Sequence, residues 1–450
     1  MENQPVTLQD VLDARERRAQ LQQKLIEMYR IPVISFTMNI AGPVKTNPQI
    51  LRAFESGRSV LENDLKEKKL PVKERCVIHE ATGDEALYAV DGDPQVLKDI
   101  CVSIEEGMMA GRLYDMDVIG ADGIKLVRET ERSCIVCGRQ GRYCASRRIH
   151  SAEEVQAAAE RLICLQYLAG DAERMGELCV QCLIDEAETT PKPGLVDRRN
   201  NGSHTDMDLP LLIKSAKALK AYFNTCFRNG YEHKGSAAQE LFPVLQEAGK
   251  KAEKTMFETT GGVNTHKGAV FHMGLICGAA GYLYRGVLKY DIDELCETVR
   301  AVCSPGLEEH FASLSEKEPA AAGEELYLRY GMKGARGEAM SGYASVRNYA
   351  LPVYRMQYRE TADPEYAGCR SLLALIAQTE DTNMIRRGGI EKACKAAAEM
   401  REKLSSGRIT IPEIQRIDDA YIKDHLSPGG SADLLAVTYL LNRLDEDGYE

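Results

Sequence analysis

The sequence predicts a multidomain protein in which an N-terminal α+β domain with a mixed sheet is followed by a C-terminal all-α domain. Short β-branched or alternating runs occur before about residue 125, whereas nearly every periodic segment after Gly170 has helical spacing. We place the domains at residues 1–170 and 171–450, with no long linker at Gly170 and Asp171. A hydrophobic content of 44% is ample for both cores.

Four segments of the N-terminal domain have the composition of strands: residues 31–40, 75–81, 86–90 and 111–119. The segment Thr-Gly-Asp-Glu between the second and third is typical of a hairpin turn. Residues 94–109 have helical spacing. Ser151 and Glu154 match a capping box, so we expect a helix to begin there.

Nine segments of the C-terminal domain have helical spacing: residues 172–187, 209–228, 237–258, 268–288, 292–302, 369–379, 389–404, 411–426 and 431–445. Strand-like alternation is absent from this half of the sequence. We therefore expect its polar clusters to lie on loops between helices.

Charge and hydropathy exclude several classes of function. The net charge of −11 disfavours a general nucleic-acid binder, so an anionic ligand must meet local basic patches. No apolar run approaches the ~20 residues that span a bilayer, and the first thirty residues contain no signal-peptide core. We expect a cytoplasmic protein with no nucleic-acid or membrane partner. Most of the fourteen cysteines, including Cys179 and Cys182, are then expected to be buried thiols.

One strand segment contains a pair of carboxylates. Alternate residues of a strand share a face, so Asp115 and Asp117 project together while Tyr114, Met116 and Val118 pack on the other side. Mg²⁺ takes one or two carboxylates and leaves its other positions to phosphate and water. The pair favours a nucleotidyltransferase-like domain, although an exposed strand face produces the same pattern.

A basic stretch follows, with seven Lys/Arg against two acids between residues 125 and 150. Within it lie Cys134, Cys137, Cys144 and His150, which are sufficient for a tetrahedral zinc site. The spacing from Cys137 to Cys144 is shorter than in common zinc modules, so reduced thiols in a polar loop are the alternative.

The C-terminal half contains several polar clusters, beginning with a Pro/Gly-punctuated loop at residues 186–208. Candidate binding or catalytic residues are Lys192, Asp197, Asn200, His204, Asp206 and Asp208 in that loop, and then His266, Lys267, Arg336, Glu338, Asp381 and Asp433. Two of these clusters are glycine-rich helix starts, which suit phosphate. No P-loop or Rossmann fingerprint is present. Together they indicate a nucleotide site made of helix termini and carboxylates.

Long motifs in both halves resemble known families. TTPKPGLVDRRNNGSHTDMD, GGVNTHKGAVFHMG, KGARGEAMSGY, DTN and SPGGSADLLAVT occur in this order and resemble triphosphoribosyl-dephospho-CoA synthase from about residue 172 onward. SFTMNIAGPVK, GRLYDMDVI and RSCIVCGRQGRYCASRRIH resemble apo-citrate lyase phosphoribosyl-dephospho-CoA transferase. The chain thus resembles a fusion of the two enzymes.

The synthase resemblance implies that the 2′-hydroxyl of dephospho-CoA attacks the anomeric carbon of ATP and displaces adenine. Under it, Asp206 and Asp208 hold Mg²⁺, with Lys192 and Lys267 at the triphosphate. His204, Asp197 or Glu338 is the base. Asp381 and Asp433 serve the adenine or a second metal, and Asn200, His266 and Arg336 complete the nucleotide site.

The transferase resemblance implies that a serine of the apo acyl carrier (γ) subunit of citrate lyase attacks the α-phosphate and releases diphosphate. Asp115 and Asp117 then hold Mg²⁺. The candidates for binding the triphosphate are Lys45, Arg112, Arg147 and Arg148, and the candidate for orienting the ribose is Asn39. The carrier of a related malonate-decarboxylating system is a second possibility. A different class is a metal-dependent all-α phosphohydrolase fused to a zinc-bearing interaction module, but the chain has no His-Asp dipeptide.

Overall fold

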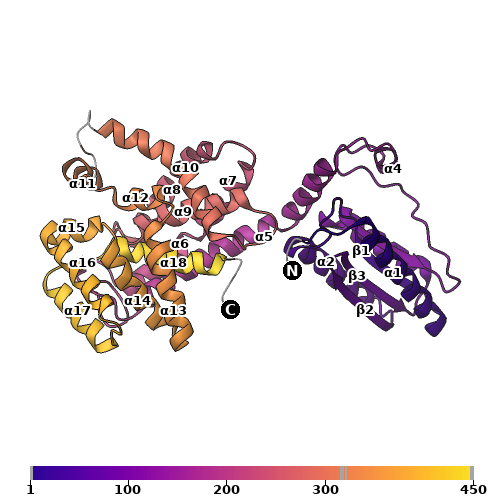
Figure 1. Ribbon diagram of the computed structural model, residues 1–450, viewed down its shortest axis with the longest axis horizontal. Helices are drawn as coiled ribbons and strands as arrows, with labels where there is room; N and C mark the ends of the chain where they lie inside the picture. The colour runs from indigo at the N-terminus through magenta and orange to yellow at the C-terminus, as the bar shows by residue number, and fades with distance from the viewer. Residues whose placement is uncertain (1–3, 315–318, 320–321, 446–450) are drawn as a thin grey trace. The chain divides into compact units, whose positions relative to one another are not determined.

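The computed structural model describes residues 4–314, 319 and 322–445. The chain divides into two compact units (Figure 1). Unit 1 contains residues 1–169 and 285–287, and unit 2 contains residues 170–284 and 288–450. Helix α5 (Ala152–Glu188) runs without a break through residue 170. Its start is the expected capping box, because the Ser151 and Glu154 side chains each accept the other residue's backbone N–H.

Unit 1 contains a four-stranded sheet in the order β2-β3-β1-β4, formed by β1 (Val33–Met38), β2 (Val72–Glu80), β3 (Gly83–Val90) and β4 (Tyr114–Ile119). The prediction of a mixed sheet is wrong, because every neighbouring pair is antiparallel. Helix α2 (Pro48–Glu67) connects β1 to β2, and β3 lies between these two strands in the sheet. Helix α3 (Pro94–Gly107) connects β3 to β4, and β1 lies between these two strands. This split β-α-β order is that of ferredoxin-like folds.

The two faces of this sheet pack against different helices. Phe36, Tyr88 and Met116 belong to a core cluster with residues of α2 and α3. On the opposite face, Val33 and Leu87 pack with residues of α1 (Leu8–Tyr29). The α1 face is the one on which Asp115 and Asp117 lie, because they alternate with the buried Tyr114, Met116 and Val118 along β4.

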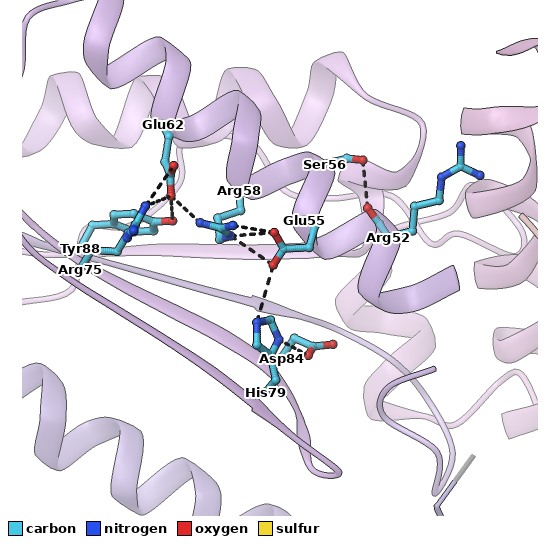
Figure 2. A network of polar contacts seen from close by, with 9 residues as sticks. All are labelled: Arg52, Glu55, Ser56, Arg58, Glu62, Arg75, His79, Asp84 and Tyr88. Atoms are coloured by element: carbon cyan, nitrogen blue, oxygen red, sulfur yellow. Dashed lines mark hydrogen bonds and ion pairs between the residues drawn. The ribbon is translucent and has the colours of Figure 1, made fainter. Parts of the chain in front are cut away.

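A polar network joins α2 to β2 and β3 (Figure 2). Glu62 accepts hydrogen bonds from Tyr88 at 2.8 Å and Arg58 at 2.7 Å. Glu55 pairs with Arg58 and lies 3.8 Å from His79. Hydrogen bonds and ion pairs therefore hold α2 against the β2 edge of the sheet.

Unit 1 also contains η1 (Ala110–Leu113) and α4 (Gly141–Ser146). The helices of unit 2 after α5 are α6 (Leu209–Ala218), α7 (Lys220–Glu232), η2 (Ala238–Glu240), α8 (Leu241–Thr260), α9 (Lys267–Leu283), α10 (Ile292–Ser313), α11 (Ala322–Tyr330), α12 (Gly334–Met340), η4 (Val346–Ala350), α13 (Leu351–Thr361), α14 (Pro364–Gln378), α15 (Thr382–Gly388), α16 (Ile390–Ser405), α17 (Ile411–Lys423) and α18 (Gly429–Leu444).

The all-α prediction for the second half is confirmed, with three differences. The helix expected at residues 292–302 continues to Ser313 as α10. The segment predicted as one helix at 209–228 is divided at Leu219 into α6 and α7. Helices α11, α12, α13 and α15 were not predicted, because they are short and either rich in glycine and charge or weakly periodic. Among the described residues, no helix is both long and apolar enough to cross a membrane.

Close packing of α7 against α9 depends on glycine. A Cβ atom at Gly281 of α9 would lie 1.9 Å from the Phe227 carbonyl oxygen of α7. A Cβ at Gly230 of α7 would lie 2.0 Å from the Gly278 carbonyl oxygen of α9. The two backbones therefore approach each other more closely than any side chain permits.

We predict that Gly281→Ala destabilises unit 2 by about 1–3 kcal/mol or more, because the added methyl group forces the helices apart. Urea unfolding followed by far-ultraviolet circular dichroism measures the change. Gly249→Ala in α8 is the matched control, since its nearest non-local atom would be the Tyr222 hydroxyl at 3.6 Å. Alanine there should stabilise by up to about 1 kcal/mol. Equal midpoints for the two variants would contradict the prediction.

Candidate active sites

Unit 2 encloses a cavity of about 850 Å³. Its walls come from the end of α5 and the loop after it, from the first turns of α9 and α18, and from α12 and α15. Nine of the residues expected from the sequence line it: Lys192, His204, Asp206, His266, Lys267, Arg336, Glu338, Asp381 and Asp433. A cavity of this size and polarity accommodates a nucleotide-sized ligand.

Three expected residues of the polar loop do not line this cavity. The buried carboxylate of Asp197 accepts the backbone N–H groups of Lys192 at 2.9 Å and Arg199 at 2.7 Å. The Asn200 amide donates to Asp418 at 2.8 Å. Asp208 caps α6 by accepting the N–H of Leu211. These three side chains therefore stabilise the loop and the start of α6 and have no place in the reacting set.

His204 is held between two partners. Its Nδ1 lies 3.1 Å from a guanidinium nitrogen of Arg387, and its Nε2 lies 2.8 Å from the Ser427 hydroxyl. Arg387 can only donate, so Nδ1 accepts and the proton is on Nε2. Burial, followed by the charge of Arg387, lowers the pKa of His204 to about 4. With both nitrogens engaged, His204 is a poor base in this arrangement.

Glu338 has the better geometry for a base. Its Oε1 accepts the Ser345 hydroxyl at 2.6 Å, and its Oε2 is buried without a hydrogen-bond partner among the described residues. Burial raises the pKa of Glu338, and the Ser345 hydrogen bond opposes this shift. A carboxylate with one fixed and one available oxygen is suited to accept a proton.

The inner wall concentrates acidic groups around a buried lysine. Lys192 is 1% exposed and pairs with Glu186, a residue that was not singled out because a charge at a helix end is usually solvated. Burial, and next the neighbouring Glu186 and Asp381, raise the pKa of Asp433 well above its ordinary value. Asp381 differs from Asp433, because both of its oxygens accept hydrogen bonds from the starts of α15 and α18.

Two cavity histidines present buried nitrogens that have no hydrogen-bond partner among the described side chains and backbone. They are Nε2 of His266, whose Nδ1 lies 3.0 Å from the Ser215 hydroxyl, and Nδ1 of His272. Burial lowers the pKa of His266 to about 4 and that of His272 to about 3. Both imidazoles are therefore neutral hydrogen-bonding groups for a ligand.

The cavity rim is basic. Lys267, Lys333, Arg386 and Arg387 are exposed and line the opening. Lys267 pairs with Glu253 at 2.9 Å, and Arg336 lies 2.9 Å from His310. Asp206, also exposed, lies 3.8 Å from His204. A polyanion at this rim would meet several cations and one carboxylate.

The carboxylate pair of unit 1 lies on β4 opposite β1. Thr37 pairs with Asp115 and Ser35 with Asp117 in the strand register. Desolvation, and then the Asp117 carboxylate, raise the pKa of Asp115. Asp117 contacts Lys125. Two carboxylates whose mutual repulsion raises a pKa fit a divalent cation, which would relieve that repulsion.

Three of the other expected residues of unit 1, Asn39, Lys45 and Arg112, lie close in sequence to the ends of β1 and β4, and the remaining two, Arg147 and Arg148, follow α4. Asn39 follows β1 and donates its backbone N–H to the Leu113 carbonyl at 2.7 Å. Lys45 donates to the Ile40 carbonyl, and burial lowers its pKa. Arg112 bonds to Ser133. Arg147 is stacked on the Tyr143 ring, and Arg148 has a positive φ of 47°.

The four zinc candidates converge. The ligand atoms of Cys134, Cys137, Cys144 and His150 all lie within 4.8 Å of one another. Among the described residues, this is the one group of three or more His, Cys, Asp or Glu with such spacing.

We predict that His204 remains neutral at pH 5.5 and that Arg387→Ala raises its pKa. Removal of the positive charge makes the imidazolium less unfavourable and frees Nδ1. Carbon-13 NMR of labelled histidine across a pH series measures both. Arg386→Ala is the control for charge at the same helix. A wild-type pKa at the ordinary 6.5 would contradict the prediction.

Residues 172–450 match the family of ATP:dephospho-CoA triphosphoribosyl transferase, and residues 6–165 match apo-citrate lyase phosphoribosyl-dephospho-CoA transferase. Protein CitXG of Haemophilus influenzae is 33% identical, over 97% of this chain and 96% of its own. Protein CitXG of Leuconostoc mesenteroides is 30% identical, over 98% and 97%. A Klebsiella pneumoniae 2-(5''-triphosphoribosyl)-3'-dephosphocoenzyme-A synthase is 38% identical, over 60% of this chain and 91% of its own. The chain therefore belongs to the ATP:dephospho-CoA triphosphoribosyl transferase family and, over its whole length, to the fused CitXG proteins.

Proposed function

We propose that the chain is a bifunctional cytoplasmic transferase that makes the citrate lyase prosthetic group in unit 2 and attaches it in unit 1. The families of the two units name these two activities, and they leave no part for a phosphohydrolase. The observation that carries the residue assignment is the cavity of unit 2, in which a basic rim surrounds a buried carboxylate with one unpaired oxygen.

In the first reaction, the 2′-hydroxyl of dephospho-CoA attacks the anomeric carbon of ATP. Glu338 takes the hydroxyl proton through its unpaired Oε2, the new C–O bond forms, and the bond to adenine breaks. Asp433 is the proton donor to the departing adenine, since burial favours its protonated form. The positive charge that develops at the anomeric carbon is stabilised by the remaining carboxylates of the inner wall.

The triphosphate is placed at the rim. Lys267, Lys333, Arg386 and Arg387 supply positive charge there. Asp206 is the carboxylate that would hold Mg²⁺ at the phosphates, and one carboxylate is sufficient for a phosphate-bound Mg²⁺. His204 supports this end of the site by its contact with Arg387.

In the second reaction, a serine of the apo acyl carrier (γ) subunit of citrate lyase attacks the α-phosphate of the triphosphoribosyl product and diphosphate leaves. Asp115 and Asp117 are the residues that would hold Mg²⁺, and the ion would supply Lewis-acid polarisation of the phosphate. Arg147, Arg148 and Arg112 bind the phosphate chain. The apo-citrate lyase description of the unit 1 family supports this carrier over that of a malonate-decarboxylating system.

Glu338→Gln is expected to lower adenine release from ATP and dephospho-CoA by about 10²-fold or more, because the amide cannot accept the proton. Chromatographic quantification of adenine measures it. Glu391→Gln, an exposed glutamate on α16, should retain the full rate. With preformed triphosphoribosyl-dephospho-CoA, the Glu338→Gln protein should still modify the carrier. A near-normal rate of adenine release would remove Glu338 from the mechanism.

Asp115→Asn and Asp117→Asn should each abolish carrier modification and leave adenine release unchanged. The reason is that an amide oxygen is a much weaker Mg²⁺ ligand than a carboxylate. Intact-protein mass spectrometry of the carrier measures the first activity, and adenine release measures the second. Asp99→Asn on α3 is the control for lost charge at an exposed site of the same unit. Full carrier modification by both site variants would refute the metal role.

A further inference from the structure

The segment between β4 and α5 lacks a hydrophobic core of its own. Of residues 121–150, all of which the structure describes, Cys144 alone is buried. The chain nevertheless makes ordered turns, since Gly138 donates its N–H to the Cys134 carbonyl at 2.9 Å and Ile149 to the Cys144 carbonyl at 3.1 Å. Turns of this kind do not fix a segment by themselves, because each backbone hydrogen bond contributes only about 1 kcal/mol net.

Four metal-ligating side chains meet at the centre of this segment. The Sγ atoms of Cys137 and Cys144 are 3.6 Å apart, and the Cys137 Sγ lies 3.2 Å from Nε2 of His150. In a tetrahedral zinc site with Zn–S near 2.3 Å and Zn–N near 2.0–2.1 Å, the ligand atoms are roughly 3.5–3.8 Å apart. The measured separations are close to this range.

A carboxylate lies beside the other ring nitrogen of His150. Nδ1 of His150 lies 3.8 Å from Oε2 of Glu154, and that oxygen accepts the N–H of Ser151 at 2.8 Å. The carboxylate is thus held in place by the first turn of α5, and it faces the nitrogen that points away from the sulfurs. The 3.8 Å separation is an ion-pair distance and not a hydrogen bond, so a small movement of the Glu154 side chain is needed before it fixes the tautomer of a metal-binding histidine.

We propose that Cys134, Cys137, Cys144 and His150 bind one structural zinc ion as three thiolates and a neutral imidazole. The ion takes the place of a hydrophobic core for residues 133–150, because its binding free energy is available to the fold only when all four ligands are assembled.

The zinc segment is joined to the strand that carries Asp115 and Asp117. Arg132, directly before the segment, donates to the Tyr114 carbonyl at 2.6 Å. Arg112 donates to the Ser133 hydroxyl at 3.0 Å. Arg147 and Arg148 lie between two of the ligands. Zinc therefore positions these arginines for carrier modification, a consequence that rests on the proposed function.

The first experiment measures metal in the full-length protein by inductively coupled plasma mass spectrometry. We expect about one zinc ion per chain after purification in the presence of zinc and removal of loosely bound metal. Cys134→Ser and His150→Ala should lose it, whereas Cys394→Ser, an exposed cysteine of unit 2, should retain it. His150→Cys should retain zinc, because a fourth thiolate replaces the imidazole. Cobalt substitution should give thiolate charge-transfer absorption that Cys134→Ser weakens.

The second experiment compares the two activities in the same variants. Cys134→Ser should lower modification of the carrier with preformed triphosphoribosyl-dephospho-CoA at least 10-fold, with adenine release unchanged. Hydrogen exchange of β1 peptides at the wild-type rate shows that the sheet of unit 1 is still folded. His150→Ala should lower carrier modification in the same way, whereas His150→Cys, which keeps a fourth ligand, should retain it.

The outcomes separate the zinc proposal from the proposed function. A zinc-free protein that cannot be loaded with zinc, equal zinc content in all variants, or a Cys137–Cys144 disulfide in non-reducing peptide mapping would overturn the zinc site. Zinc at one per chain without either transferase activity would support the zinc site and overturn the proposed function. Loss of zinc with full carrier modification would overturn the positioning role.

Discussion

Two buried carboxylates hold the loop on which the cavity of unit 2 depends. Asp418, which has no exposed surface, accepts the Gly194 N–H at 2.9 Å and the Asn200 amide at 2.8 Å. Asp197 accepts backbone N–H groups from within the loop itself. A buried carboxylate is costly unless its oxygens are hydrogen-bonded, so the loop closes around both groups. That closure brings Lys192, His204 and Asp206 to the cavity wall.

Partners, rather than residue type, separate the roles of the cavity acids. Asp381 has both oxygens occupied by the starts of two helices, so it is part of the frame. Glu338 has one oxygen occupied and one free. Asp433 lies near two other acids, and its raised pKa favours the protonated form. One residue class therefore supplies a structural tie, a proton acceptor and a proton donor.

Prediction from the sequence succeeded for local features and failed where the outcome depends on non-local partners. Alternation along residues 114–118 correctly placed Asp115 and Asp117 on one face, because strand periodicity is local. The antiparallel sheet was missed, because the insertion of β1 between β3 and β4 is a non-local pairing. Most expected cavity residues line the cavity, but Asp197, Asn200 and Asp208 do not. Composition shows that a loop is polar, and it does not show which polar groups bind the loop's own backbone.

The exposed position of the rim cations is consistent with a site that must release its product. Lys333, Arg386 and Arg387 face solvent, where ion pairs are screened and individually contribute about 0–1 kcal/mol. Several such cations can gather a triphosphate without holding it as firmly as buried partners would. The product of unit 2 keeps that triphosphate, and the carboxylate pair of unit 1 is proposed to act on it. Because both units belong to one chain, every molecule that makes the product also carries the unit proposed to use it. Moderate binding at the rim then favours transfer, since tight retention would slow the second reaction.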